Sequence, residues 1–162
     1  MKVYIRNKQR SIRINQRRVR RLLKMALRLL GLQESELSIV FVNDRRMRIL
    51  NRQFRGIDRT TDVLSFPQQS AEAGKSRRKE RSLRTSGLQT SQYRLILGDI
   101  VVSLQRCKRQ AREHGLTFDE ELRRAAVHGL LHLAGYDHEK SRYQKSKMES
   151  KEVELHEGLR YL

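Results

Sequence analysis

The eleven residues 128–138, HGLLHLAGYDH, constrain the fold more than any other part of this 162-residue chain. His128 and His132 lie four residues apart, so on a helix they share one face and their imidazole nitrogens can reach a common point. His138 is too far along the chain to lie on the same helical run and still face that point. Gly135 can adopt the left-handed conformation that ends a helix, which would bring the chain back. The segment therefore predicts a helix that ends in a glycine bend, with three imidazoles gathered beside it.

Three imidazoles at one point are typical of a site for a divalent metal ion. Neutral histidine nitrogens suit borderline-soft cations, and zinc is the usual occupant. We therefore expect one Zn²⁺ per chain, with His128, His132 and His138 as its ligands. Three protein ligands leave a fourth position for water or substrate, as in a catalytic site, whereas a further ligand would make the zinc structural. The remaining histidines, His114 and His156, are predicted to be surface residues.

Hydrophobic periodicity around the motif predicts alternating strands and helices. Asn43 and Asp44 are predicted caps at the start of a short helix. The inner face of this helix is predicted to carry Met47, Leu50 and Phe54. Strands are predicted at 2–6, 37–42, 63–66 and 93–102. Helices are predicted at 15–30, in a short segment after Asp44, between the fourth strand and Glu113, at 118–134 and at 142–159. One face of the last helix carries Met148, Glu152, Leu155 and Leu159.

These elements predict an α+β fold in a single domain over residues 1–162. We expect a small mixed β-sheet of about four strands packed with about five α-helices, with the metal site at the end of one helix. Residues 68–92 are rich in Ser, Gln, Lys and Arg and poor in large apolar groups. They are therefore predicted to form a mobile basic loop.

The charge of the chain indicates the kind of partner. There are 36 lysines and arginines against 18 aspartates and glutamates, a net charge of +18. A field of this sign attracts polyanions, above all nucleic acid. The single cysteine, Cys107, excludes an internal disulfide framework, and no run approaches the 18 apolar residues of a membrane span. We therefore expect a cytoplasmic protein without a membrane partner.

The histidine spacing also occurs in metzincin proteases, whose motif is HExxHxxGxxH. In those enzymes the residue after the first histidine is a glutamate that serves as general base. Gly129 occupies this position here and cannot carry a proton. The metal geometry is therefore predicted without the base for peptide hydrolysis, which argues against a protease.

The histidine segment resembles the signature HGxLHLxGYDH of the YbeY family of bacterial endoribonucleases. Arg55-Gly56, followed by TDVLSFP at 61–67, is similar to the family's RG…T(D/N)VLSFP segment. Further agreement lies at Asn43-Asp44, Leu50-Asn51 and Gly98-Asp99-Ile100. Together these stretches span about residues 40–140 in the order that the family shows.

This resemblance implies a single-strand-specific, metal-dependent endoribonuclease. The implied work is 3′-end maturation of 16S rRNA and late-stage ribosome quality control, with ribosomal RNA and the ribosome or its proteins as partners. Two alternatives stay open. One is a metalloprotease-like hydrolase on a similar scaffold, and the other is a ribosome- or RNA-binding factor with a mainly structural zinc.

Carried over by position, the three motif histidines are the implied zinc ligands, and Arg55 is the arginine expected beside the substrate phosphate. We expect Arg55 and His128 to be catalytic, with the metal activating water or polarising the phosphate that the guanidinium holds. An ion pair of Arg55 with Asp58 or Asp62 is the alternative. Asp62 and Asp137 are candidate acceptors for the second N–H of a ligand histidine. No residue stands out as a general base.

Overall fold

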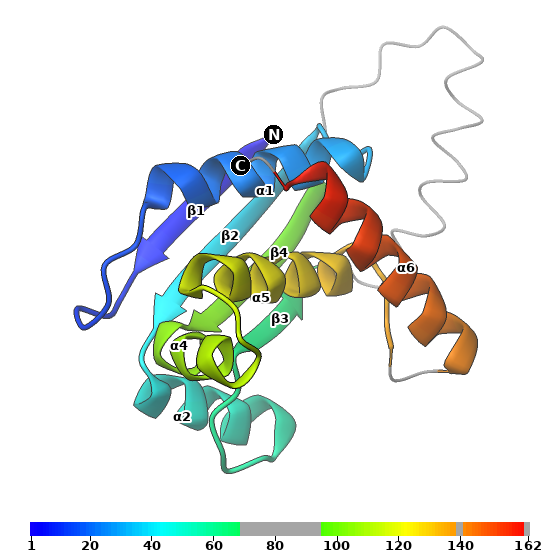
Figure 1. Cartoon of the computed structure of the whole chain (residues 1–162). Coiled ribbons are helices and arrows are strands. Elements are labelled where there is room, and N and C mark those ends of the chain that lie inside the picture. Colours follow the sequence, from blue (N-terminus) through cyan, green and yellow to red (C-terminus); the bar gives the residue numbers. More distant parts are fainter. Residues whose placement is uncertain (69–94, 139–140, 161–162) are drawn as a thin grey trace, which may run out of the picture.

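The computed structural model describes residues 1–68, 95–138 and 141–160. Within them, four strands and five helices form the predicted α+β arrangement (Figure 1). In chain order these are β1 (Lys2–Asn7), α1 (Gln16–Leu29), β2 (Ser35–Val42), α2 (Asp44–Arg55), β3 (Val63–Pro67), β4 (Leu95–Ser103), α4 (Leu104–Glu113), α5 (Phe118–Leu133) and α6 (Arg142–Gly158). None of the described helices has the length and apolar sequence needed to cross a bilayer. Apart from Gln68, the predicted basic loop 68–92 lies outside the described residues.

The strands form one mixed sheet in the order β1-β2-β4-β3. β1 pairs with β2 and β2 with β4 in parallel, and β3 runs antiparallel to β4 at the edge. Gly98 in β4 lies so close to the carbonyl oxygen of Phe66 in β3 that a side chain has no room there. Glycine at this position therefore allows β3 to pair closely with β4 at the edge of the sheet.

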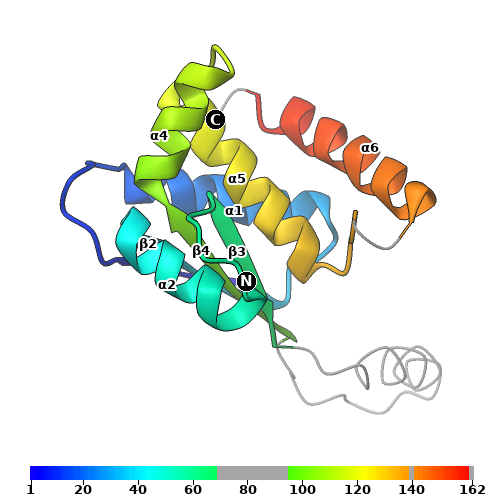
Figure 2. The same cartoon turned by 90° about the horizontal axis from the view of Figure 1, so that it is seen from below.

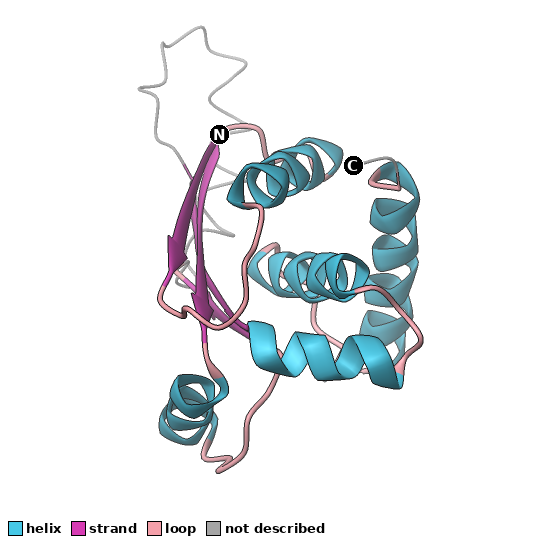
Figure 3. Cartoon of the chain, turned by 60° about the vertical axis from the view of Figure 1, so that its left-hand side comes forward, coloured by secondary structure: helices cyan, strands magenta, loops and turns pink. Residues whose placement is uncertain are grey.

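The sheet carries a hydrophobic core on each face, because successive strand residues point to opposite sides. Ile39 and Ile100 belong to the larger core, shared with α1, α4, α5 and α6. Val101 belongs to the smaller core, which Met47 of α2 covers. Figure 3 shows α1 and α5 on one side of the sheet. Phe54, predicted on the inner face of α2, is exposed instead.

α5 is the central helix of the larger core. It packs against β3, β4, α1, α4 and α6, and Figure 2 shows it between the sheet and α6. From Ala125 to Leu133 its sequence is apolar apart from the two histidines, which is typical of a helix that is surrounded by other elements. A capping box of Thr117 and Glu120 is present at its start. The fold therefore fixes the position of its other end, which carries the histidine motif.

Candidate active site at the end of α5

The predicted glycine bend follows α5 directly. The helix ends at Leu133, and Gly135 has a φ of +91°. The N–H of Tyr136 then donates to the carbonyl oxygen of Leu131 at 3.0 Å. This bond satisfies a carbonyl left free at the helix end and turns the chain back. The bend brings His138 beside the two histidines of α5.

The three predicted ligand histidines lie together. Their ring centroids are 4.8, 5.0 and 5.2 Å apart, and one nitrogen of each ring lies within 4.8 Å of the others. The Nε2 atoms of His128 and His132 are 3.2 Å apart, close to the separation of about 3.4 Å between two ligands of one tetrahedral zinc. Nδ1 of His138 is buried without a hydrogen-bond partner in the described chain, a state that a bound ion or water relieves. The trio can therefore hold a metal ion.

The cluster contains only histidines. Within residues 1–68, 95–138 and 141–160, no cysteine, aspartate or glutamate joins the trio as a fourth ligand. Three imidazoles are a ligand set that zinc and several other divalent ions accept. The arrangement therefore shows a site that could hold a metal without showing which metal.

A carboxylate from α6 contacts one member of the trio. Oε1 of Glu152 lies 2.7 Å from Nδ1 of His128. This hydrogen bond lowers the pKa of Glu152 and outweighs partial burial, which acts in the opposite direction. An ionised carboxylate only accepts hydrogen bonds, so Nδ1 of His128 donates to Glu152, and Nε2 is the nitrogen that faces His132. This is the histidine–carboxylate pair that is common around protein-bound metals.

The sequence predicted other acidic residues as hydrogen-bond acceptors for the histidines of the trio. It placed Glu152 on the inner face of the last helix and proposed Asp62 and Asp137 as acceptors. Both aspartates line the same cavity as the histidines, and the carboxylate of Asp62 accepts a hydrogen bond from the hydroxyl of Thr61 at 3.0 Å. The signal for Glu152 was one acidic residue among the apolar positions of an amphipathic face.

The histidines open into a cavity of about 850 Å³. Its walls come from the end of α2, the edge strand β3, the start of β4 and the segment 132–138. Arg55, Asp62 and Asp137 all line it, as do Phe54 and Tyr136. The structure therefore places every residue predicted for the site around one hollow.

Arg55 is the last residue of α2, and its side chain is exposed. Gly56 follows with a φ of +70° and ends the helix, which leaves Arg55 at a terminus beside the cavity. Of its two predicted ion-pair partners, Asp58 binds Arg48 through both carboxylate oxygens, at 2.7 and 2.9 Å. Asp58 is therefore engaged by a different arginine.

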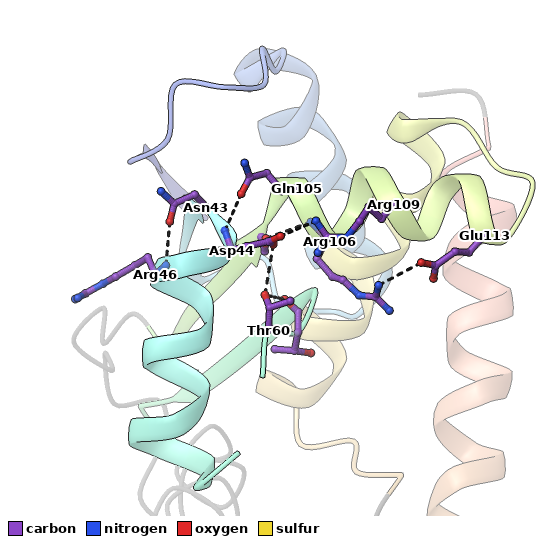
Figure 4. Close-up of polar contacts among 10 residues, drawn as sticks. Asn43, Asp44, Arg46, Thr60, Gln105, Arg106, Arg109 and Glu113 are labelled. Atoms are coloured by element: carbon purple, nitrogen blue, oxygen red, sulfur yellow. Dashed lines mark hydrogen bonds and ion pairs between the residues drawn. The ribbon is translucent and has the colours of Figure 1, made fainter. Parts of the chain in front are cut away.

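A polar network anchors the opposite end of α2 to α4 (Figure 4). The carboxylate of Asp44 accepts a hydrogen bond from the Ser103 hydroxyl at 2.6 Å and pairs with Arg109 at 2.6 Å. The N–H of Asp44 donates to the side chain of Gln105 at 2.9 Å. Burial raises the pKa of Asp44, but the hydrogen bonds from Arg109 and Ser103 outweigh it and lower the pKa overall. The network fixes the helix that carries Arg55.

Gly129 marks the closest approach of α5 to the sheet. A Cβ at this position would lie 2.9 Å from Cγ2 of Ile100 and 3.0 Å from Cγ2 of Val63. The hydroxyl of Ser65 also donates to the Gly129 carbonyl at 3.0 Å. The packing of α5 on the sheet therefore leaves no room for a side chain at position 129 unless Ile100 or Val63 shifts.

Comparison with known proteins agrees with this arrangement. The sequence profile described as "Endoribonuclease YbeY" matches residues 4–160. Among proteins of that name, one from Pelotomaculum thermopropionicum is 44% identical over 123 residues, which are 76% of this chain and 71% of the relative. One from Aquifex aeolicus is 37% identical over 146 residues, 90% of this chain and 83% of the relative.

The fold has a counterpart among solved structures. The solution structure of TM1509 from Thermotoga maritima aligns with a TM-score of 0.62 and 26% identity, over 97% of this chain and 88% of that one. The profile match runs from β1 into the residues after α6 and includes all three histidines. On this evidence the chain belongs to the endoribonuclease YbeY family.

Proposed function

We propose that this chain is a zinc-dependent endoribonuclease that cleaves single-stranded ribosomal RNA. The observation that carries the proposal is the convergence of three imidazoles at the edge of a cavity that Arg55 also lines. Cleavage of a phosphodiester requires stabilisation of the charge on the phosphoryl oxygens, which cations at fixed positions provide. The names of the family and of its members support ribonuclease activity.

The histidines have the proposed role of holding zinc. Neutral imidazole nitrogens of His128, His132 and His138 suit this ion. A bound divalent ion supplies Lewis-acid stabilisation of phosphoryl oxygens and makes water more acidic. Glu152 accepts from Nδ1 of His128, so Nε2 would be the nitrogen of this ring that holds the ion. Asp62 and Asp137 line the cavity and are proposed to accept hydrogen bonds within the same site.

Arg55 is proposed to bind the phosphate. A guanidinium stays charged at all relevant pH values, and its fork of donors matches two phosphate oxygens. The anchoring of α2 through Asp44 gives this group a fixed base. In this role Arg55 orients the phosphodiester and offsets charge that develops on it during cleavage.

The charge of the protein supports an RNA substrate. The net charge is +18, and several arginines lie exposed along α1, namely Arg17, Arg18, Arg20, Arg21 and Arg28. We propose 3′-end maturation of 16S rRNA and ribosome quality control in the cytoplasm as the biological setting, with the ribosome or its proteins as partners. RNA affinity should then fall as salt rises, because bound counterions are released from the phosphates.

Cleavage of a labelled single-stranded RNA tests the proposal. Wild-type protein should cleave it, whereas chelated protein and the His128→Ala variant should not, and returning zinc should rescue only the wild type. His114→Gln is a matched control, because His114 lies outside the trio and glutamine can still donate to Glu121, its partner at 3.1 Å. Undiminished cleavage by His128→Ala, or by chelated protein without bound metal, would refute the proposal.

A further inference from the structure

Phe54 is an exposed aromatic residue on the wall of the cavity. Met47, two helical turns earlier on the same predicted face, is fully buried, whereas 56% of Phe54 is exposed. A large aromatic ring left open to solvent is informative when it also lines a cavity with polar and charged groups. Here that cavity holds the three histidines and Arg55.

The ring of Phe54 packs against a neighbouring aromatic ring. It meets Phe66 of β3 edge to face, with centroids 4.9 Å apart and an interplanar angle of 71°. Phe66 is partly buried against the smaller core, so it gives Phe54 a fixed neighbour. An edge-to-face contact covers at most one face of either ring. An aromatic ring with a fixed neighbour and an open face is suited to stacking on a second flat group.

The cavity links Phe54 to the metal-binding trio around the edge strand β3. Val63 and Ser65 lie against Gly129 of α5, and the alternate residues of β3, Leu64 and Phe66, belong to the smaller core on the α2 side. A bound RNA strand can therefore lie in a single cavity that the histidines, Arg55 and Phe54 all line. A phosphate at Arg55 leaves an adjoining base within the cavity that Phe54 also lines.

We propose that Phe54 binds an unpaired nucleobase of the substrate by stacking, next to the phosphate held by Arg55. This inference rests on the proposed ribonuclease function and adds the origin of its preference for single strands. Within a duplex both faces of a base are covered by its neighbours, so only an unstacked base can lie on Phe54. Stacking accepts any base, since each has a flat π face.

Fluorescence of 2-aminopurine in a short RNA tests the stacking directly. We would titrate single-stranded RNA and a matched duplex, each carrying this base analogue, with wild-type protein and the variants Phe54→Leu, Phe54→Tyr and Ile49→Ala. Ile49 is a matched control because it is also an exposed apolar residue of α2 and is absent from the cavity lining. Circular dichroism and zinc content would be measured for each variant.

Wild type should quench the fluorescence, and Phe54→Leu should lose the quenching and bind single strands roughly 5- to 140-fold more weakly. Phe54→Tyr and Ile49→Ala should behave like wild type, and duplex affinity should change little. Unchanged binding by Phe54→Leu, equal losses for both RNA forms, or a loss in Phe54→Tyr equal to that in Phe54→Leu would overturn the proposal. Failure of wild type to cleave RNA would refute the enzymatic function separately, because binding and quenching are measured without cleavage.

Discussion

Removal of the Glu152 carboxylate should weaken metal binding while leaving the three histidines in place. The contact to Nδ1 of His128 is short, at 2.7 Å, and a shielded hydrogen bond of this type to a charged group is worth about 1.5–3 kcal/mol. The side chains of His128 and Glu152 are 34% and 26% exposed, so solvent reduces this value to about 1–2 kcal/mol. Glu152→Ala should therefore raise the zinc dissociation constant roughly 5- to 30-fold, which falls within or near the range known for such partners.

Glu152→Gln separates the hydrogen bond from the charge. The glutamine carbonyl oxygen can still accept from Nδ1, so the ring keeps its orientation, but the negative charge that makes the imidazole more basic is lost. We expect a smaller loss than for alanine, about half of it in free energy. Zinc affinity should therefore decrease in the order wild type, Glu152→Gln, Glu152→Ala. This order is a more specific expectation than a loss in a single variant.

Competition with a chromophoric chelator would measure zinc affinity in each variant. Glu154→Ala is the matched control, because Glu154 is an exposed acid of the same helix that pairs with Lys151 rather than with a histidine. Circular dichroism would check that α6 remains folded. Equal zinc affinity in Glu152→Ala and wild type, or equal losses in Glu152→Ala and Glu154→Ala, would refute the reasoning.

Three other changes test further parts of the structure. Gly129→Ala should destabilise the fold by about 1–3 kcal/mol in thermal or urea unfolding, because its Cβ would lie about 3 Å from Ile100 and Val63; unaltered stability would contradict the close packing of α5. Asp44→Asn should lower stability at neutral pH by about 1–2 kcal/mol. Because the pKa of Asp44 is lowered in the folded protein, its contribution is present above the unfolded pKa and is lost as pH falls through the folded pKa. The stability gap between wild type and Asp44→Asn should therefore begin to narrow in urea titrations below about pH 4 and close as pH falls further, and a gap that does not narrow with falling pH would disagree with the ion pair to Arg109. Arg55→Glu should abolish most RNA cleavage while zinc content stays normal, and full activity in that variant would remove Arg55 from the proposed site.

The histidine cluster could be predicted because its information is local in the sequence. The i, i+4 spacing of His128 and His132 and the bend at Gly135 are properties of one helix and its end, and both are confirmed. The contact of Glu152 with His128 joins residues that are 24 positions apart on different helices. Spacing within a segment carries no information on which helices pack together, so this partner emerged only from the fold.

Phe54 shows a second limit of sequence periodicity. Its spacing from Met47 and Leu50 correctly indicates a shared face of α2, but Met47 is buried and Phe54 is exposed. Periodicity gives the direction of a side chain and not whether another element covers that turn of the helix. The α+β class, the mixed four-stranded sheet and the five helices, by contrast, follow from alternating patterns over whole segments and are confirmed.

The separation of His128 and Glu152 along the chain has a consequence for the order of events during synthesis. Translation produces α5 before α6, so the three imidazoles are made before the carboxylate that contacts His128. That contact forms only once α6 has docked on α5. The full affinity for metal that is proposed for the trio would therefore depend on the folding of α6.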